Sequence, residues 1–386
     1  MPVQQPGRRR ATRWWGVVAA GAMAAGVVAV APASPAGATT RSYTVFASGL
    51  DNPRHLAIGR HGSVYVAESG RGGGTCVTGT DPESGEPTEV CAGRTGALTR
   101  ISAEGVARKV LTNLPSFAGP EGTDAIGPVD VSTAEGLNVL ISNSTGAPPA
   151  LAATLQGSGT LIRRVPGTGG IRTVADLAAY EASANPDGGV IDSDPYGLYT
   201  GRDGNHYVAD AAGNDLLAVT KAGAISTVAV LPGGQALAPP FLGLPPGTKV
   251  PYEPVPTSVD VGPDGRPYVG QLTGFPFPED LAKVFKIGRF GGVSGFAYGF
   301  TNIVDIDFGP DGSLYVVEIA TKGLLSDTGG PPVGGLWRVR PDGSKELLSG
   351  PELVLPGGVV VAGNGAVYVS INSTSPGEGQ ILRYRP

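Results

Sequence analysis

Four polar residues recur at one position of a repeated sequence unit and could together hold a ligand. Each unit has a glycine that launches an apolar strand, and six positions after it stand Glu68, Asp210, Gln271 and Glu318. In the second unit this position is occupied by Asn143, if one extra residue is allowed for. In the sixth unit it is occupied by Ile371. Hard cations prefer several oxygen ligands, so a ring of carboxylates and amides near a common axis could bind Ca²⁺ or a hydroxylated ligand.

A structural role for these side chains is the competing interpretation. They could cap the loops that follow their strands. They could also pair with basic residues that recur in a later strand of the units, namely Arg100, Lys286, Arg338 and Arg383. Structural ion pairs are common in repeat proteins, which favours this role, and the ligand site is the alternative.

One of the three histidines is placed for chemistry. His55 begins an inner strand at the mouth of the expected channel, whereas His61 occupies a turn and His206 lies within a strand, as a core residue would. The sequence contains no G-x-S-x-G, H-E-x-x-H or P-loop pattern and no Cys–His pairing. The usual nucleophile, zinc and nucleotide machinery is therefore not indicated.

Aspartates recur in the expected inner strands, as Asp130, Asp260 and Asp307. Hydrogen bonding from one repeat to the next is the simplest explanation for them. Asp305 stands two positions before Asp307, and two neighbouring carboxylates could suit acid–base chemistry.

All these residues lie on a repeated turn and strand, seen most clearly in Gly309-Pro-Asp-Gly312 and the following Leu314-Tyr-Val-Val-Glu318. Pro presets φ, Asp bonds back to its own backbone and Gly accepts a positive φ, while the apolar, β-branched run is typical of a strand. The glycines that launch the strands are Gly62, Gly136, Gly204, Gly265, Gly312 and Gly365. Repeats of roughly 40 to 60 residues built from short strands are typical of propeller blades. The sequence therefore predicts an all-β fold, a six-bladed β-propeller.

The two ends of the chain should complete one blade together. A blade contains four strands, A to D, with A nearest the axis, but the last blade stops at Tyr384 without a D strand. The segment 43–46 resembles a D strand and precedes the first A strand. We expect the N-terminal strand to close the ring, because closure removes exposed sheet edges.

The antiparallel strand order places the B–C and D–A connections on one face of the ring, here called the loop-rich face, and the tight A–B turns on the other, the turn face. The long insertions all fall on the loop-rich face, at 69–96, 115–126, 143–159, 181–194, 232–256, 272–281 and 319–335. Insertions on one side of a repeat scaffold usually build its site, so this is the candidate binding face. Alternatively, the loops only shield that end of the ring.

Residues 1–38 have the pattern of a secretory signal peptide: four arginines precede the apolar run 14–31, and Ala36-Gly-Ala38 is a cleavage site. An uncleaved anchor is the alternative, since the run is near the lower length limit of a membrane span. We expect residues 39–386 to be one propeller domain, secreted and extracellular, with no stable membrane insertion after cleavage. Its formal net charge would be −9 instead of −5, because four arginines and no acids are lost. With no basic cluster, a nucleic-acid partner has no electrostatic support.

The two cysteines, Cys76 and Cys91, lie in one excursion between strands of the first blade. In an exported protein we expect them to form a disulfide, worth about 3 kcal/mol in the chain-entropy model. A metal pair is the weaker interpretation, because no histidine or third cysteine lies nearby.

Several stretches resemble a known bacterial family. They are Asn52-Pro-Arg54, Gln271-Leu-Thr-Gly-Phe-Pro-Phe-Pro278 and 299–318, and 207–215 resembles an NHL-type propeller repeat. The chain is similar to the ScyD/ScyE family of secreted propeller proteins, named after two proteins of a cyanobacterial sunscreen-pigment cluster. The resemblance covers nearly the whole mature chain and implies a secreted six-bladed propeller, with no catalytic residues to carry over.

The function we expect is binding of a small molecule or cell-envelope component on the loop-rich face, by a monomer, with His55, Glu68, Asp210, Gln271 and Glu318 as candidate residues. The alternative is an enzyme of the same architecture, either a gluconolactonase-like metal-dependent hydrolase or a quinone-dependent sugar oxidoreductase. The hydrolase holds its cation with Glu, Asn and Asp at the starts of inner strands. Here those starts are His55, Val129, Tyr196, Ser258, Val304 and Gly358, without a carboxylate.

Overall fold

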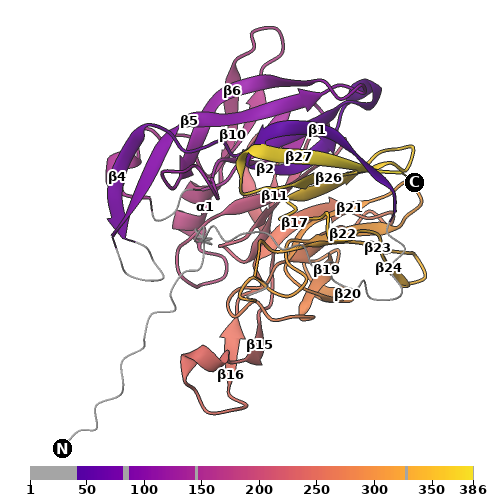
Figure 1. Cartoon of the computed structure of the whole chain (residues 1–386). Helices are drawn as coiled ribbons and strands as arrows, with labels where there is room; N and C mark the ends of the chain where they lie inside the picture. Colours follow the sequence, from indigo (N-terminus) through magenta and orange to yellow (C-terminus); the bar gives the residue numbers. More distant parts are fainter. Residues whose placement is uncertain (1–40, 81–86, 144–146, 327–328, 386) are drawn as a thin grey trace, which may run out of the picture.

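The computed structural model describes residues 41–80, 87–143, 147–326 and 329–385. The expected signal peptide, 1–38, lies outside the described residues. The described chain is almost entirely β-structure and forms six sheets arranged as blades around one axis (Figure 1). This confirms the six-bladed β-propeller.

Each blade is an antiparallel sheet, numbered here by the chain order of its inner strand. Blade one contains β2 (Pro53–Ile58), β3 (Val64–Glu68), β5 (Pro87–Ile101) and β6 (Ala107–Ala118), with β4 (Thr75–Thr80) added to β5. Blade two contains β7 (Pro128–Ser132), β8 (Asn138–Ile141), β9 (Thr160–Arg164) and β10 (Ile171–Asp176). Blade three contains β11 (Pro195–Thr200), β12 (His206–Asp210), β13 (Asp215–Val219) and β14 (Ile225–Val230).

The second half of the ring is built in the same way. Blade four contains β17 (Pro256–Val261), β18 (Pro267–Gln271), β19 (Ala282–Ile287) and β20 (Val293–Phe300). Blade five contains β21 (Ile303–Phe308), β22 (Leu314–Glu318), β23 (Gly335–Val339) and β24 (Lys345–Leu347). Blade six contains β25 (Gly358–Val361), β26 (Val367–Ile371), β27 (Pro376–Tyr384) and, as its outer strand, β1 (Tyr43–Asp51).

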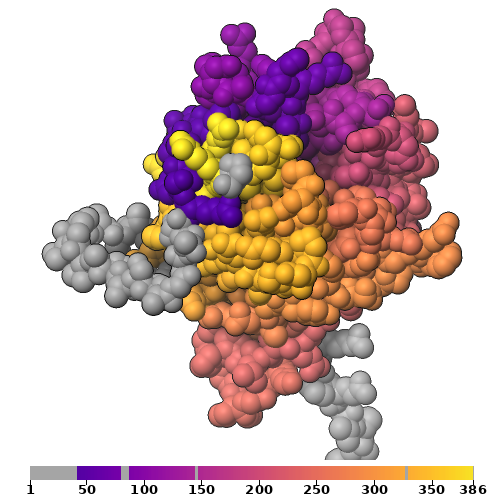
Figure 2. All heavy atoms as spheres, turned by 90° about the vertical axis from the view of Figure 1, so that its right-hand side faces the viewer, coloured from indigo at the N-terminus to yellow at the C-terminus, as the bar shows by residue number. Residues whose placement is uncertain are grey.

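The N-terminal strand closes the ring, as predicted. β1 pairs antiparallel with β27, with Tyr43 opposite Tyr384 and Leu50 opposite Gly379. Figure 2 shows the indigo start of the described chain lying against its yellow end. The inner strands also close a circle, since β2 lies against both β7 and β25, and contacts continue through β11, β17 and β21.

The Pro-Asp-Gly turns have the geometry that their residues predict. In blade five, Gly312 has a φ of 78° and its N–H donates to the carbonyl of Gly309 at 2.9 Å. The Asp311 carboxylate accepts the N–H of Ser313 at 3.0 Å, which is the back-bonding expected of this residue.

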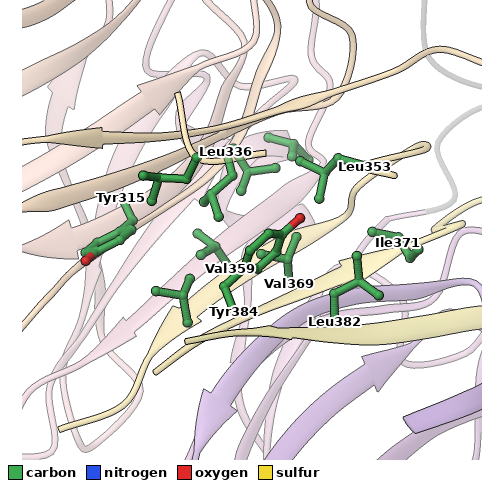
Figure 3. Packing of buried hydrophobic residues seen from close by; sticks show 12 residues of the cluster. Tyr315, Leu336, Leu353, Val359, Val369, Ile371, Leu382 and Tyr384 are labelled. Carbon is green, nitrogen blue, oxygen red and sulfur yellow. The ribbon is translucent and has the colours of Figure 1, made fainter. Parts of the chain in front are cut away.

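The hydrophobic core lies between the blades. Buried side chains form one cluster between each pair of neighbouring blades, since alternate residues of a strand face opposite sides of the sheet. Figure 3 shows the cluster between blades five and six, where Tyr315 and Leu336 of one blade meet Val359, Val369 and Tyr384 of the other. Closing the ring therefore completes the burial of the last blade as well as its strand pairing.

The excursion of blade one is a β-hairpin held by a disulfide. Cys76 on β4 lies opposite Cys91 on β5, and their sulfurs are bonded, which confirms the predicted pairing. Val77 and Val90 of the hairpin pack against a small cluster that contains Leu151. This excursion has more apolar support than its glycine content suggests, because the neighbouring blade-two connection supplies that support.

Three further elements stand in the long connections and were not expected from the sequence. Helix α1 (Leu177–Ala184) follows β10, and strands β15 (Gly234–Leu237) and β16 (Lys249–Tyr252) pair as a hairpin that projects from the ring (Figure 1). Short 3₁₀ turns are η1 (Arg60–Gly62), η2 (Pro149–Leu151) and η3 (Pro240–Leu242). No helix in the described ranges is long and apolar enough to cross a membrane.

Candidate functional site

Three of the four recurring polar residues serve as caps for the chain that enters the inner strand. Glu318 accepts the backbone N–H of Thr301 at 2.6 Å and the indole N–H of Trp337 at 2.7 Å. Glu68 accepts the N–H of Asp51 at 2.7 Å in the equivalent place of blade one. In these two blades, a carboxylate at the end of the B strand therefore holds the preceding D–A connection to its blade.

Asp210 performs the same task in blade three. Its Oδ1 accepts the N–H groups of Asp194 at 2.7 Å and Gly213 at 3.0 Å, and its Oδ2 accepts the Ser193 hydroxyl at 2.6 Å. It thus caps both the D–A and the B–C connection. Burial raises the pKa of Asp210, Glu68 and Glu318, in the last case to about 7. With exposed fractions of 2% or less, the three carboxylates are turned toward backbone donors.

Gln271 occupies the equivalent position of blade four but lacks this partner. Its side chain is completely buried, and neither Oε1 nor Nε2 has a hydrogen bond. In blades one and five the donated N–H belongs to the residue two positions before the inner strand, and here that residue is Pro254, which has no N–H. A carboxylate at this position would have no backbone N–H to accept, and the chain has the neutral amide of Gln271 there instead.

Two of the recurring basic residues of the C strands, Arg338 and Lys286, form ion pairs at the other end of the blade. Arg338 lies opposite Tyr315, three residues from Glu318, and its guanidinium forms an ion pair with Asp311 of the Pro-Asp-Gly turn. Lys286 pairs in the same way with Asp264, at 2.6 Å. The suggested pairing of Arg338 and Lys286 with the polar ring is therefore wrong, because the strand register directs both side chains toward the turn face.

His55 lies on the axis within a buried charged cluster. Its Nδ1 is 3.1 Å from Oδ2 of Asp130 and 3.8 Å from Oδ1 of Asp305. These residues occupy the same level of the ring, the third position of β2, β7 and β21. At that level of blade four stands Ser258, whose buried hydroxyl has no hydrogen-bond partner, like Nε2 of His55. We call His55, Asp130, Asp305 and Ser258 the axial cluster.

The two acids of the axial cluster also connect the blades. Asp130 accepts the N–H of Leu198 in blade three at 2.6 Å, and Asp305 accepts that of Val359 in blade six at 2.8 Å. Asp260 and Asp307 make the same kind of bond one level further along the axis, to Phe308 and Val361. The predicted hydrogen bonding between repeats is present at Asp130, Asp260 and Asp307, and Asp305 makes the same kind of bond.

Electrostatics favour a charged imidazole at this level. Burial opposes the charge of His55, but Asp305 and Asp130 outweigh it and raise the pKa of His55 to about 9. Burial likewise raises the pKa of Asp305 to about 7, although His55 counteracts this effect. The cluster therefore carries an imidazolium between two carboxyl groups at neutral pH.

Tyr196 fills the axis at the loop-rich end of the cluster. Its ring centroid is 5.3 Å from that of His55, in an edge-on arrangement. The same side chain packs against buried residues of blades two and three, of blades five and six, and of the connection that carries Leu272. A ligand approaching the axial cluster from this face would therefore meet Tyr196 first.

The projecting hairpin exposes apolar side chains that the sequence analysis did not single out. Leu237 and Phe241 are 65% and 66% exposed, and Leu242 and Leu244 beside them are also exposed. Phe241 approaches Phe275 of the next connection, with 6.2 Å between ring centroids. We call Leu237, Phe241, Leu242 and Leu244 the hairpin tip. The signal in the sequence was the proline-flanked apolar run 237–246 within a long connection.

No protein-family model and no curated protein matches this chain. Its structural neighbours are six-bladed β-propeller proteins. A protein of unknown function from Bacteroides thetaiotaomicron has a TM-score of 0.53 and 11% identity, covering 89% of this chain and 72% of that one. A glucose dehydrogenase has a TM-score of 0.51 and 12% identity, covering 89% and 99%. A streptogramin B lyase has a TM-score of 0.47 and 13% identity, covering 89% and 97%. At these identities the likeness establishes the fold alone.

Proposed function

We propose that the protein is a secreted binding protein that recognises a cell-envelope component with its loop-rich face. The observation that carries this proposal is the projecting β15–β16 hairpin, which presents an exposed apolar tip beyond the ring. Exposed apolar groups gathered on a protruding segment are typical of interaction surfaces. The signal-like segment 1–38 and the disulfide Cys76–Cys91 support export to the cell surface or beyond.

The arrangement of polar groups supports binding by the loops over chemistry at the axis. Glu68, Asp210 and Glu318 hold the long connections in place, and Tyr196 covers the axial cluster. A hollow of about 390 Å³ lies on the opposite, turn face, beside Asp311 and Arg338. A macromolecular partner suits an apolar tip that protrudes, whereas a small ligand would need a concave pocket.

The family assignment within this proposal rests on sequence motifs. Asn52 and Asn302 of the ScyD/ScyE-like stretches are buried, have φ near +50° and donate from their amides to carbonyls of neighbouring connections. These motifs thus shape the loop-rich face. We propose membership of that family on this ground.

The test is co-sedimentation of the purified protein with isolated envelopes of the host cell. We expect the double substitution Phe241→Ser and Leu244→Ser to weaken binding at least about tenfold, because burying a Phe or Leu side chain contributes about 1.5 to 3 kcal/mol. Val106→Ser is the matched control, since Val106 is 65% exposed in a C–D turn of the turn face. Equal binding by the hairpin-tip variant and the parent protein would refute the role of the hairpin. A thermal-shift screen with sugars, lactones and quinones tests the small-molecule alternative.

The alternative function is that of a hydrolase or sugar oxidoreductase working at the axis. The observation in its favour is Nε2 of His55, which is buried without a hydrogen-bond partner beside a carboxylate. Such chemistry would require Tyr196 to move aside. Lactone hydrolysis, or sugar oxidation with an added quinone, that disappears in His55→Gln would replace our proposal with this one.

A further inference from the structure

Five acidic side chains gather where the long connection of blades two and three covers the end of the β12–β13 hairpin. Glu181 lies on α1, Asp187 and Asp192 lie in the connection, and Asp210 and Asp215 face each other across β12 and β13. We call these five residues the blade-three acidic cluster. In the part of the chain that the structure describes, Glu181, Asp187, Asp210 and Asp215 form no ion pair with a lysine or arginine.

The connection is folded back onto the strands by its own hydrogen bonds. Asp176 caps the N-terminus of helix α1, because its carboxylate accepts the N–H of Ala179, and Asn185 caps the C-terminus in the left-handed conformation. The amide of Asn214 then donates to Asp187 at 3.0 Å, and Ser193 donates to Asp210 at 2.6 Å. These bonds hold Asp187 and the residues after it against the strand ends that carry Asp210 and Asp215.

Two members of the cluster have buried oxygens without partners. Asp215 is 1% exposed, and its Oδ1 accepts no hydrogen bond. Glu181 is 3% exposed, and the same is true of its Oε1. A buried carboxylate oxygen normally has a donor or a counter-charge, because removing it from water costs several kcal/mol.

The carboxyl groups repel one another. Burial, together with Asp210, Glu181 and Asp187, raises the pKa of Asp215 to about 9. Burial, with Asp210 as the largest charged contributor, raises the pKa of Glu181 to about 7. By contrast, Lys109 lowers the pKa of Glu68, and His55 lowers that of Asp305. Among the described residues, no lysine, arginine or histidine acts in this way on Asp215 or Glu181.

We propose that the blade-three acidic cluster binds a hard divalent cation, Ca²⁺, through Asp215 and Glu181 together with the loop carboxylates Asp187 and Asp192. The donor set consists of oxygens alone, which suits Ca²⁺ and excludes the nitrogen and sulfur ligands that zinc prefers. Ca²⁺ also accepts six to eight oxygens in irregular geometry, as a loop and two strand ends would supply. Asp210 stays a cap and adds negative charge behind the ligands.

Binding would draw the connection inward. Among the described residues, three potential metal-ligand atoms lie within 4.8 Å of one another only at Cys76, Glu89 and Cys91, where the two cysteines form a disulfide. The acidic cluster does not meet this distance criterion. The oxygens of the acidic cluster therefore stand further apart than in a bound state. A cation should tighten segment 185–194 against β12 and β13 and protect it from proteases. This inference does not depend on the proposed function, because the cluster lies outside the hairpin tip and the axial cluster.

The experiment titrates CaCl₂ into EDTA-treated protein and follows heat release and the melting temperature. We expect one ion per chain with a Kd on the order of 10⁻⁴ M or tighter, as in extracellular calcium modules, and a rise in melting temperature. Asp215→Asn and Glu181→Gln should each weaken binding at least about tenfold, in line with the loss of a metal ligand. Asp342→Asn, which removes an exposed turn carboxylate of blade five, should bind Ca²⁺ like the parent protein.

In the metal-free state, we expect these substitutions not to lower the melting temperature. In EDTA, Asp215→Asn should melt at or close to the temperature of the parent protein, since the carboxyl group that it replaces is neutral near pH 7 and its Oδ1 has no hydrogen-bond partner. If Asp215→Asn does not fold, Glu181→Gln decides the outcome. The proposal is overturned if the parent protein binds no Ca²⁺, or if both folded variants bind it as the parent does. Retained binding in Glu68→Gln is expected, since Glu68 belongs to blade one.

Discussion

Nδ1 of His55 lies 3.1 Å from Oδ2 of Asp130, so an ion pair joins blades one and two at the axis of the propeller. The same Asp130 oxygen accepts the N–H of Leu198, which belongs to blade three. One carboxylate thus connects three consecutive blades where the ring is narrowest. The stability of the ring should depend on the charge of this cluster.

His55 should make the protein less stable as the pH rises. Its pKa is about 9 in the folded state against an ordinary value of 6.5, so its contribution is complete below pH 6.5 and is lost as the pH rises through 9. Asp305, with a pKa near 7 instead of 3.8, acts in the same direction at lower pH. Comparing urea unfolding at pH 6 and 9.5, we expect His55→Gln to remove on the order of 2 kcal/mol of this pH dependence. His61→Gln, in an exposed turn, is the control, and an unchanged profile in His55→Gln would contradict the assignment.

Removing the cap at Glu318 should destabilise the fold without unfolding it. Glu318→Ala leaves the backbone N–H of Thr301 and the indole N–H of Trp337 without an acceptor, and each unsatisfied buried donor costs about 1 to 3 kcal/mol. We expect a loss of about 3 kcal/mol in the free energy of unfolding, measured with urea. Glu104→Ala, at an exposed turn, should change it by less than about 0.5 kcal/mol. Equal stability of Glu318→Ala and the parent would show that the cap is dispensable.

The equivalent position of blade four should respond in the opposite way. Neither polar atom of Gln271 has a partner, so Gln271→Leu removes buried polar groups and leaves no donor unsatisfied. We expect an unchanged or higher melting temperature, because apolar replacement of an unpaired polar group is nearly neutral or stabilising. A clear drop in melting temperature would instead reveal an interaction of this amide that matters, such as a bound ligand.

The disulfide should tether its hairpin without supporting the ring. Replacing Cys76 and Cys91 with Ser should leave the main unfolding transition nearly intact and increase proteolysis between Gly70 and Gly96. The β4–β5 pairing and the contacts with Leu151 lie away from the inter-blade core, which explains the separation. A thiol assay that found two reactive thiols in exported protein, or a large fall in melting temperature of the variant, would contradict this expectation.

The N-terminal strand should be essential for blade six. Deleting residues 39–48 removes most of the β1–β27 pairing and the buried side chain of Ala47, so we expect aggregation or a large loss of stability. Deleting residues 39–41 should be nearly neutral, because the pairing begins at Tyr43. Light scattering and thermal melting compare the two deletions. A longer deletion that melted like the parent protein would mean that another segment completes the blade.

The blades and their closure could be predicted from the sequence because their signals are local. Pro310, Asp311 and Gly312 determine a turn through their own φ preferences and back-bonding, whatever surrounds them. The missing D strand after Tyr384 and the D-like segment at 43–46 then leave one way to complete the ring. Cys76 and Cys91 could be paired for the same reason, since the chain offers no other cysteine.

The tertiary structure alone decided what the polar side chains do. Glu318 and its donor at Thr301 are 17 residues apart, and whether a carboxylate there meets a cation or a backbone N–H depends on how the D–A connection returns to its blade. Blade four shows this dependence, because Pro254 in the connection leaves Gln271 without a donor. Asp215 and Glu181 likewise became neighbours only when α1 and the connection after it folded back over β12 and β13. Strand propensity and turn chemistry act over a few residues, whereas the partner of a buried charge is determined by the path of the whole connection.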